Sequence, residues 1–153
     1  MAGGLDPSGE PFPSARPTFA AHRLEALRPA RIMVVEDDYL VALDVQDRLT
    51  EVGFVVLGIA KSAAEAIALA TVERPELAIM DIRILGPRDG IETAIELRSR
   101  FDIPCVFATA HVDDETIARA NPAGPLGWVA KPYSIAALVQ LLNEVLPPSE
   151  GNG

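Results

Sequence analysis

The sequence predicts a doubly wound α/β fold, in which a five-stranded parallel sheet carries helices on both faces. Between residues 31 and 146, five short apolar runs alternate with segments of helical spacing. The runs are apolar throughout rather than at every second position, as expected of strands that are covered on both faces. Strands that alternate with helices in this way are typical of a parallel sheet.

The predicted strands are short runs rich in aliphatic and β-branched residues. In chain order they cover residues 32–35, 54–60, 77–80, 105–109 and 127–130. No internal repeat or low-complexity segment interrupts this order.

A helix is expected after each strand, because apolar residues recur there every three or four positions. The helical positions are Val41, Val45, Leu49 and Val52 after the first strand, Ala63, Ala66, Ile67 and Ala70 after the second, Ile91, Ala94, Ile95 and Arg98 after the third, and Ile135, Leu138, Leu142 and Val145 after the fifth. The helix after the fourth strand, around residues 113–120, is expected to be short, because Pro122 and Pro125 follow it.

The two ends of the chain differ from this alternating part. Five of the thirteen prolines lie in residues 1–30, and proline disfavours regular structure. We therefore expect a proline-rich N-terminal arm over 1–30, in which residues 18–28 form a short helix capped by Thr18; the alternative is a helix that forms only partly. Residues 147–153 are expected to be a flexible tail. A single folded domain over 31–146 remains.

Composition and charge exclude several classes of protein. The chain has 13 basic and 22 acidic residues, a net charge of −9, which argues against binding to nucleic acid or to an anionic membrane surface. The single cysteine, Cys105, excludes an internal disulfide or a multi-cysteine zinc site. No apolar run approaches the roughly 20 residues that span a bilayer, and the first residues lack the pattern of a signal peptide. We expect a cytoplasmic protein.

Residues able to carry chemistry stand at the ends of four predicted strands. Because the carboxyl ends of parallel strands meet at one edge of a sheet, these side chains are expected to lie together. They are Glu36 and Asp37 after the first strand, Asp81 after the third, Thr109 at the end of the fourth and Lys131 after the fifth. The neighbouring Asp38 is expected to cap the following helix instead.

This combination favours phosphoryl chemistry. Clustered carboxylates repel one another, and a hard divalent cation such as Mg²⁺ relieves the repulsion and leaves positions open for phosphate oxygens. One carboxylate can then attack a phosphoryl group to give an acyl phosphate. Lys131 and Thr109 would contact the phosphoryl oxygens from other sides.

Five segments resemble the receiver domain of bacterial two-component response regulators, which has a flavodoxin-like fold. They are VVEDD at residues 34–38, AIMDIR at 78–83, DG at 89–90, FATA at 107–110 and AKPY at 130–133. The resemblance covers residues 31–146. FATA also partly resembles the FAT GUY receivers, which are single-domain regulators of bacterial stress pathways; Ala110 stands where that group has glycine.

The resemblance implies a role for each site residue. Asp81 would accept a phosphoryl group from a histidine kinase or a histidine phosphotransfer protein. Asp37, Asp81 and the main-chain carbonyl of Arg83 would bind Mg²⁺, with Glu36 acting through a water molecule. The chain would catalyse its own phosphorylation and dephosphorylation without being a conventional enzyme.

The resemblance also implies a switch. Thr109 would hydrogen-bond the phosphoryl group and move inward on phosphorylation, followed by the aromatic side chain of Trp128. Lys131, before a Pro132 that is typically cis in receivers, would pair with the phosphoryl oxygens.

Three features depart from the usual receiver pattern or tune it. Glu36 replaces a more usual aspartate, and the loop over residues 84–90 is about one residue longer. Arg83 and His111 flank the path of an attacking water. We hypothesise that their bulk slows loss of the phosphoryl group; the alternative is that both face solvent.

Only seven residues follow Leu146, so we expect the output to be phosphorylation-controlled contact with a downstream protein. In receivers this contact uses the face that here holds Val112, Ile117, Trp128, Tyr133 and Ile135. One alternative is a receiver-like binding module that is never phosphorylated. A phosphatase of the haloacid dehalogenase type is disfavoured, because Arg83 stands where it needs a second acid. A flavodoxin-like electron carrier is disfavoured by the acids after the first strand.

Overall fold

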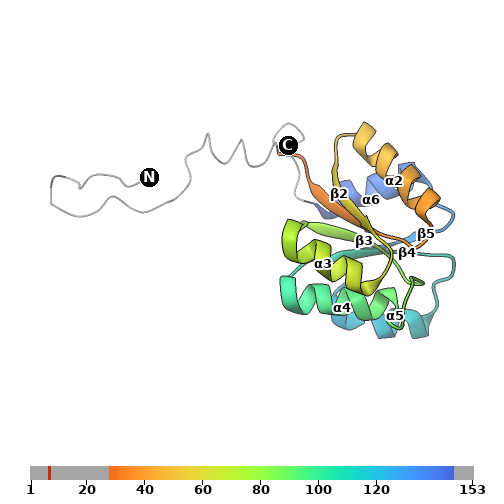
Figure 1. Cartoon of the computed structure of the whole chain (residues 1–153). Coiled ribbons are helices and arrows are strands. Elements are labelled where there is room, and N and C mark those ends of the chain that lie inside the picture. Colours follow the sequence, from red (N-terminus) through yellow and green to blue (C-terminus); the bar gives the residue numbers. More distant parts are fainter. Residues whose placement is uncertain (1–6, 8–27, 147–153) are drawn as a thin grey trace. The chain divides into compact units, whose positions relative to one another are not determined.

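The computed structural model describes Pro7 and residues 28–146 (Figure 1). The predicted tail over 147–153 and nearly all of the predicted arm, including the helix alternative at 18–28, lie outside these residues. Within them, no helix is long and apolar enough to cross a membrane.

Five parallel strands form one sheet. They are β1 (Arg31–Val35), β2 (Val55–Ala60), β3 (Leu77–Asp81), β4 (Cys105–Thr109) and β5 (Gly127–Ala130). Their order in the sheet is β2-β1-β3-β4-β5. The connection from β1 therefore leads to β2 on one side of the sheet, whereas the connections from β3 lead to β4 and β5 on the other. Sheets of this kind bind ligands in the crevice between the two strands at which the direction changes, here β1 and β3.

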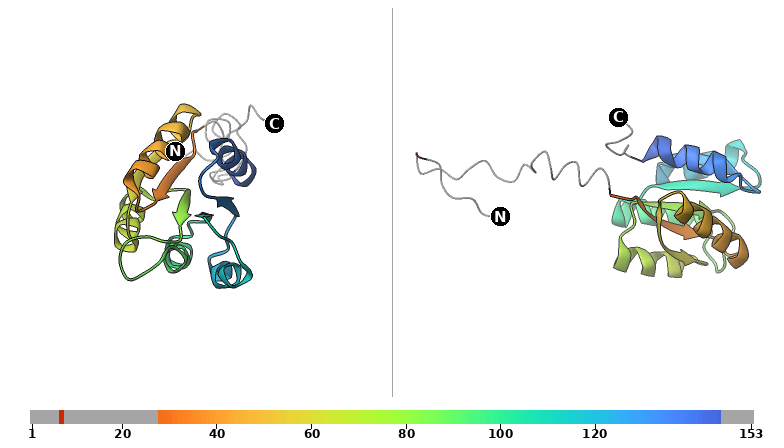
Figure 2. Two further views of the ribbon diagram at one scale, coloured as in Figure 1. Left: turned by 90° about the vertical axis from the view of Figure 1, so that its right-hand side faces the viewer. Right: turned by 90° about the horizontal axis from the view of Figure 1, so that it is seen from above.

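Five helices cover the sheet in two layers. They are α2 (Tyr39–Glu51), α3 (Ala63–Glu73), α4 (Gly90–Phe101), α5 (Asp114–Ala120) and α6 (Ile135–Val145), with a 3₁₀ turn, η1, at Asn121–Ala123. Figure 1 shows α2 and α6 on one side of the sheet and α3, α4 and α5 on the other, and Figure 2 shows the same layers from two further sides. The predicted doubly wound fold is confirmed.

Each face of the sheet has its own hydrophobic core. Alternate residues of β1 divide between them: Ile32 and Val34 pack with α2 and α6, whereas Met33 and Val35 pack with α3 and α4. All five residues of β3 are buried. This double burial explains why the strands are apolar throughout.

Polar caps fix where the helices begin. The side chains of Asp38, Ser62, Asp89, Asp113 and Ser134 each accept a backbone N–H from the first turn of the helix that follows. Such a bond satisfies a donor that the helix itself cannot pair. The predicted capping role of Asp38 is thus confirmed.

The prediction for the end of α2 was wrong at one position. Val52 was assigned to the apolar stripe, but the helix ends at Glu51 and Val52 is 54% exposed. Gly53 follows with φ of 103°, a conformation that favours glycine and turns the chain out of the helix.

Candidate functional site

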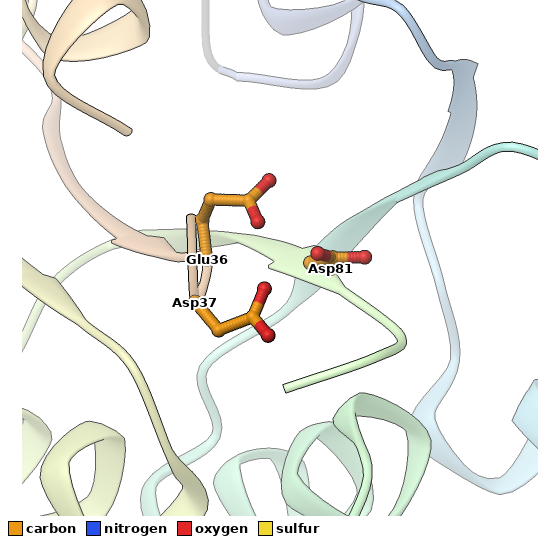
Figure 3. A group of neighbouring side chains, drawn as sticks. All are labelled: Glu36, Asp37 and Asp81. Carbon is orange, nitrogen blue, oxygen red and sulfur yellow. The ribbon is translucent and has the colours of Figure 1, made fainter. Parts of the chain in front are cut away.

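Three carboxylates meet at the carboxyl edge of the sheet, in the crevice between β1 and β3. Val35 and Met80 are partners in the sheet register, so Glu36 and Asp37 leave β1 beside the point where β3 ends in Asp81. One oxygen from each of the three carboxylates lies within 4.8 Å of the others. Figure 3 shows Glu36 and Asp37 extending from the end of β1 toward the side where Asp81 lies. The predicted acidic cluster is therefore present.

The turn after Asp81 depends on a glycine. The Gly90 N–H donates to the Ile82 carbonyl at 2.7 Å, which draws the start of α4 against the end of β3. A Cβ atom at position 90 would lie 1.9 Å from the Asp81 carbonyl oxygen. Only glycine allows the two segments to approach this closely.

The loop between these two segments is anchored on its other side by the sheet edge. The Leu85 N–H donates to the Lys61 carbonyl at 3.0 Å, and Leu85 forms an isolated bridge with Ser62. Gly86 follows with φ of 93°. The loop that the sequence marks as unusual thus reaches past β1 to the turn after β2.

Lys131 bridges the two buried acids. Its Nζ donates to Glu36 Oε1 at 2.8 Å and to Asp81 Oδ2 at 3.1 Å. The Glu36 side chain is 1% exposed, and that of Asp81 8%. The Lys131–Pro132 peptide bond is cis, as the resemblance implies. Lys131 therefore supplies the positive charge that two buried carboxylates need.

The pKa values show how crowded the negative charge is. Burial raises the pKa of Glu36, and neighbouring Asp81 raises it further, although Lys131 and the Asp38 N–H oppose the rise. Burial and proximity to Glu36 also raise the pKa of Asp37. Burial alone would lower the pKa of Lys131, but its bonds to Glu36 and Asp81 outweigh burial and raise it. The cluster thus favours an additional cation.

The donor set fits magnesium. Three carboxylates in reach of one another provide the hard oxygen ligands that Mg²⁺ prefers, with room for water or phosphate oxygens. Asp37 is the most accessible of the three acids, so it lies where an ion would enter. The Arg83 carbonyl as a further ligand, and the water between Glu36 and the metal, stay predictions.

A cavity of about 660 Å³ opens above this cluster. It gathers every site residue that the sequence predicts except Trp128: Glu36, Asp37, Asp81, Arg83, Thr109, His111 and Lys131. Arg83 also contacts the acid directly, since its backbone N–H donates to Asp81 Oδ1 at 3.3 Å. A phosphoryl group on Asp81 would therefore be surrounded by these side chains.

The two predicted switch residues are held elsewhere in this structure. Thr109 Oγ1 donates to the His111 carbonyl at 3.1 Å and accepts the His111 N–H at 3.3 Å. The Trp128 ring stacks on Phe107, with 4.8 Å between centroids and 26° between planes. Their inward movement, and the bond from Thr109 to a phosphoryl group, stay predictions.

One contact beside the site could not be predicted from the sequence. Arg119 of α5 donates to Asp89 Oδ2 at 2.8 Å, which ties α5 to the residue that caps α4. The partners are thirty residues apart and on different helices, so no local spacing could indicate the pair.

The fold and site together define a receiver-type protein. The sheet order, the three clustered acids and the bridging lysine occupy the places that the five sequence segments predict. Residues 32–143 match the family of response regulator receiver domains, and the chain belongs to that family.

Two curated regulators are similar in sequence to this chain. The transcriptional regulatory protein PdtaR of Mycobacterium tuberculosis is 36% identical over 115 residues, which cover 75% of this chain and 56% of PdtaR. The phyllosphere-induced regulator PhyR of Methylorubrum extorquens is 27% identical over 128 residues, 83% of this chain and 47% of PhyR. The chain thus spans about half the length of these curated relatives.

Solved structures show the same fold. The Vibrio cholerae chemotaxis protein CheY4 superposes with a TM-score of 0.71 at 26% identity, over 77% of this chain and 99% of CheY4. The signal receiver domain of a modulated diguanylate cyclase from Desulfovibrio desulfuricans G20 superposes with a TM-score of 0.70 at 34% identity. The match covers 76% of this chain and 92% of that domain's chain.

Proposed function

We propose that the chain is the phosphoacceptor of a two-component phosphorelay, with Asp81 as the residue that carries the phosphoryl group. The observation that carries the proposal is the position of Asp81. Asp81 lines the cavity, and its carboxylate lies beside two further acids and 3.1 Å from the Lys131 amine. An aspartate in such surroundings is suited to nucleophilic attack on phosphorus.

The donor would be a phosphohistidine of a histidine kinase or of a phosphotransfer protein. An Asp81 oxygen forms a bond to phosphorus while the phosphorus–nitrogen bond breaks, and the histidine departs as the neutral ring after taking up a proton. Magnesium, held by Asp37, Asp81 and the main-chain carbonyl of Arg83, with Glu36 acting through a water molecule, would offset the negative charge between acid and phosphoryl group. Lys131 and Thr109 would donate to the phosphoryl oxygens.

The output would be contact with a downstream protein through the face formed by α5, β5 and α6. Two apolar side chains, Val112 and Ile117, are exposed near this face, at 42% and 38%. Trp128 and Tyr133 are partly buried against the two cores. A change at Trp128 would therefore alter the surface on which these residues lie.

A phosphatase of the haloacid dehalogenase type fits the site poorly. Its general acid and base would have to stand two residues after the nucleophile, where this chain has Arg83, which cannot transfer a proton near neutral pH.

The proposal is tested by incubating the chain with acetyl phosphate, with and without Mg²⁺, and measuring the intact mass. We expect one phosphoryl adduct on the wild type in the presence of Mg²⁺, and none on Asp81→Asn. The matched control is Asp113→Asn, which changes an acid of the same cavity and keeps a side chain able to cap α5. The proposal is contradicted if the folded wild type neither forms the adduct nor binds beryllofluoride in the presence of Mg²⁺. That result would favour a phosphorylation-independent binding module.

A further inference from the structure

The Tyr133 hydroxyl is buried without a partner. Among the side-chain nitrogen and oxygen atoms buried within residues 28–146, it is the one atom that makes no hydrogen bond. Buried polar groups are nearly always paired, so an exception needs a physical reason. A phenylalanine would fill the same space without this cost.

The Tyr133 ring lies near the amine that bridges the two buried acids. Lys131 Nζ lies 5.8 Å from the centroid of the Tyr133 ring, while it bonds both Glu36 and Asp81. Burial, followed by the charges of Glu36 and Asp81, raises the pKa of Tyr133. The hydroxyl therefore keeps its proton and is available as a donor.

Phosphorylation would change the partners of Lys131. A phosphoryl group on Asp81 brings additional negative charge and new acceptor oxygens next to the Lys131 amine. When the amine turns to these oxygens, Glu36 Oε1 loses the donor that it has now, while Oε2 keeps the Asp38 N–H at 3.1 Å. Glu36 is almost fully buried, and a buried carboxylate oxygen without a donor is strongly unfavourable.

We infer that Tyr133 is a positioning residue of the phosphorylated state, in which its hydroxyl replaces the Lys131 amine as a donor to Glu36. The unpaired donor and the acceptor that loses its partner would then satisfy each other. Glu36 has one methylene more than aspartate, which gives its carboxylate a longer reach. The inference rests on the proposed function, because it requires Lys131 to move toward a phosphoryl group.

The test is Tyr133→Phe, which removes the hydroxyl and keeps the ring. We would measure the affinity for beryllofluoride in the presence of Mg²⁺ by isothermal titration calorimetry, and the free energy of unfolding without either ligand. We expect the dissociation constant for beryllofluoride to rise about tenfold, because one hydrogen bond to a charged group is lost. The free energy of unfolding of the ligand-free chain should stay the same or increase, because the lost hydroxyl had no partner.

Two further variants make the result specific. Tyr39→Phe is the matched control, since Tyr39 is the other tyrosine of the chain and is 53% exposed; it should change neither quantity. In a Glu36→Gln background, Tyr133→Phe should weaken beryllofluoride binding less than in the wild type, because the charge that the hydroxyl serves is gone.

The inference is overturned if Tyr133→Phe binds beryllofluoride as tightly as Tyr39→Phe. It is also overturned if Tyr133→Phe weakens binding only as much as it destabilises the ligand-free fold, because the hydroxyl would then be merely structural. If the wild type itself does not bind beryllofluoride, the proposed function fails first and the inference falls with it.

Discussion

Lys131 is the residue on which the electrostatics of the site depend most. It bonds a fully buried glutamate and the proposed phosphoacceptor at once, and its own side chain is 23% exposed. Without this amine, the acids would have to share a proton or bind a cation. In this structure the lysine thus offsets the charge of both acids.

Replacing Lys131 should therefore make folding stability depend more strongly on pH. Burial already raises the pKa of Glu36, and loss of the amine that opposes the rise should raise it further. A carboxyl with a raised pKa binds its proton more tightly in the folded state, so stability increases as pH falls toward the ordinary value of 4.5. For Lys131→Met we expect a loss of about 1–2 kcal/mol near neutral pH, less than for a fully buried pair because the lysine is partly exposed.

Urea unfolding without metal, at about pH 8 and about pH 5, measures this effect. Lys131→Met should gain more stability on acidification than the wild type does. Lys61→Met is the control, because Lys61 is the only other lysine and is exposed. Equal pH dependence in the two variants would contradict the role given to Lys131.

We hypothesise that the bulk of Arg83 and His111 slows the attack of water on the phosphoryl group. Both side chains are exposed and both line the cavity above Asp81. If their bulk obstructs the attacking water, Arg83→Ala and His111→Ala should each shorten the half-life of the acyl phosphate roughly threefold. The half-life is measured by intact mass after removal of the phosphodonor. Arg88→Ala, in the same loop but outside the cavity, should leave it unchanged, and unchanged half-lives in all three variants would refute the obstruction.

At the scale of elements, the segment between β3 and α4 links the site to both neighbouring turns. Three contacts hold it in place. The Gly90 N–H donates to the Ile82 carbonyl, the Leu85 N–H donates to the Lys61 carbonyl, and Asp89 forms an ion pair with Arg119. The first of these contacts lies directly on the backbone of Asp81. The geometry of the acid therefore depends on a residue that carries no functional group.

Gly90→Ala should consequently be the most damaging small substitution near the site. The added Cβ atom would lie 1.9 Å from the Asp81 carbonyl oxygen. This backbone atom cannot move without displacing Asp81. We expect a loss of about 3 kcal/mol in the free energy of unfolding, together with loss of Mg²⁺ binding. Gly127→Ala is the control: there the nearest atom is the flexible Leu141 Cδ1 at 2.6 Å, and about 1 kcal/mol is expected. Equal losses for the two variants would contradict the account of this turn.

The sequence predicted elements well wherever hydropathy decides them. All five strands were placed to within one residue at either end, because burial on both faces leaves a continuous apolar run. Val52 was misplaced because the helical stripe continues past the position where Gly53 ends the helix. The order of the strands was not predictable from these patterns, because hydropathy shows that a strand is buried but not which strand lies beside it.

Within the site, the sequence predicted the identity of the acids and the lysine but not their bonds. Glu36 and Lys131 are 95 residues apart, and only the folded sheet shows that they pair. The same holds for the Tyr133 hydroxyl, whose lack of a partner is visible only in the packed structure. The type of a residue and its place at the end of a strand are enough to predict that a site is there. The hydrogen-bond partner of each atom depends on tertiary packing and is not visible in the sequence.

At the scale of the whole molecule, cation binding and folding should be coupled. An ion that binds only the folded state stabilises it in proportion to the logarithm of its concentration. At about 100 times its dissociation constant, Mg²⁺ should raise the free energy of unfolding of the wild type by about 2.7 kcal/mol. Chelation should reverse this gain.

Two neighbouring acids provide the comparison. Asp37→Asn should lose most of the Mg²⁺-dependent stabilisation, since Asp37 belongs to the acidic cluster. Asp38→Asn should keep it, because Asp38 caps α2 and asparagine caps equally well. Urea unfolding with and without Mg²⁺ measures both, and equal stabilisation of the two variants would place the ion elsewhere.

The central claim is that Asp81 carries the phosphoryl group, and borohydride reduction tests it most directly. Borohydride converts an aspartyl phosphate to homoserine, so peptide mass spectrometry of the phosphorylated chain identifies the modified position. We predict homoserine at position 81 alone, and only in samples phosphorylated in the presence of Mg²⁺. Reduction at Glu36 or Asp37, or an unmodified position 81 in a chain that carries the phosphoryl adduct, would contradict the claim.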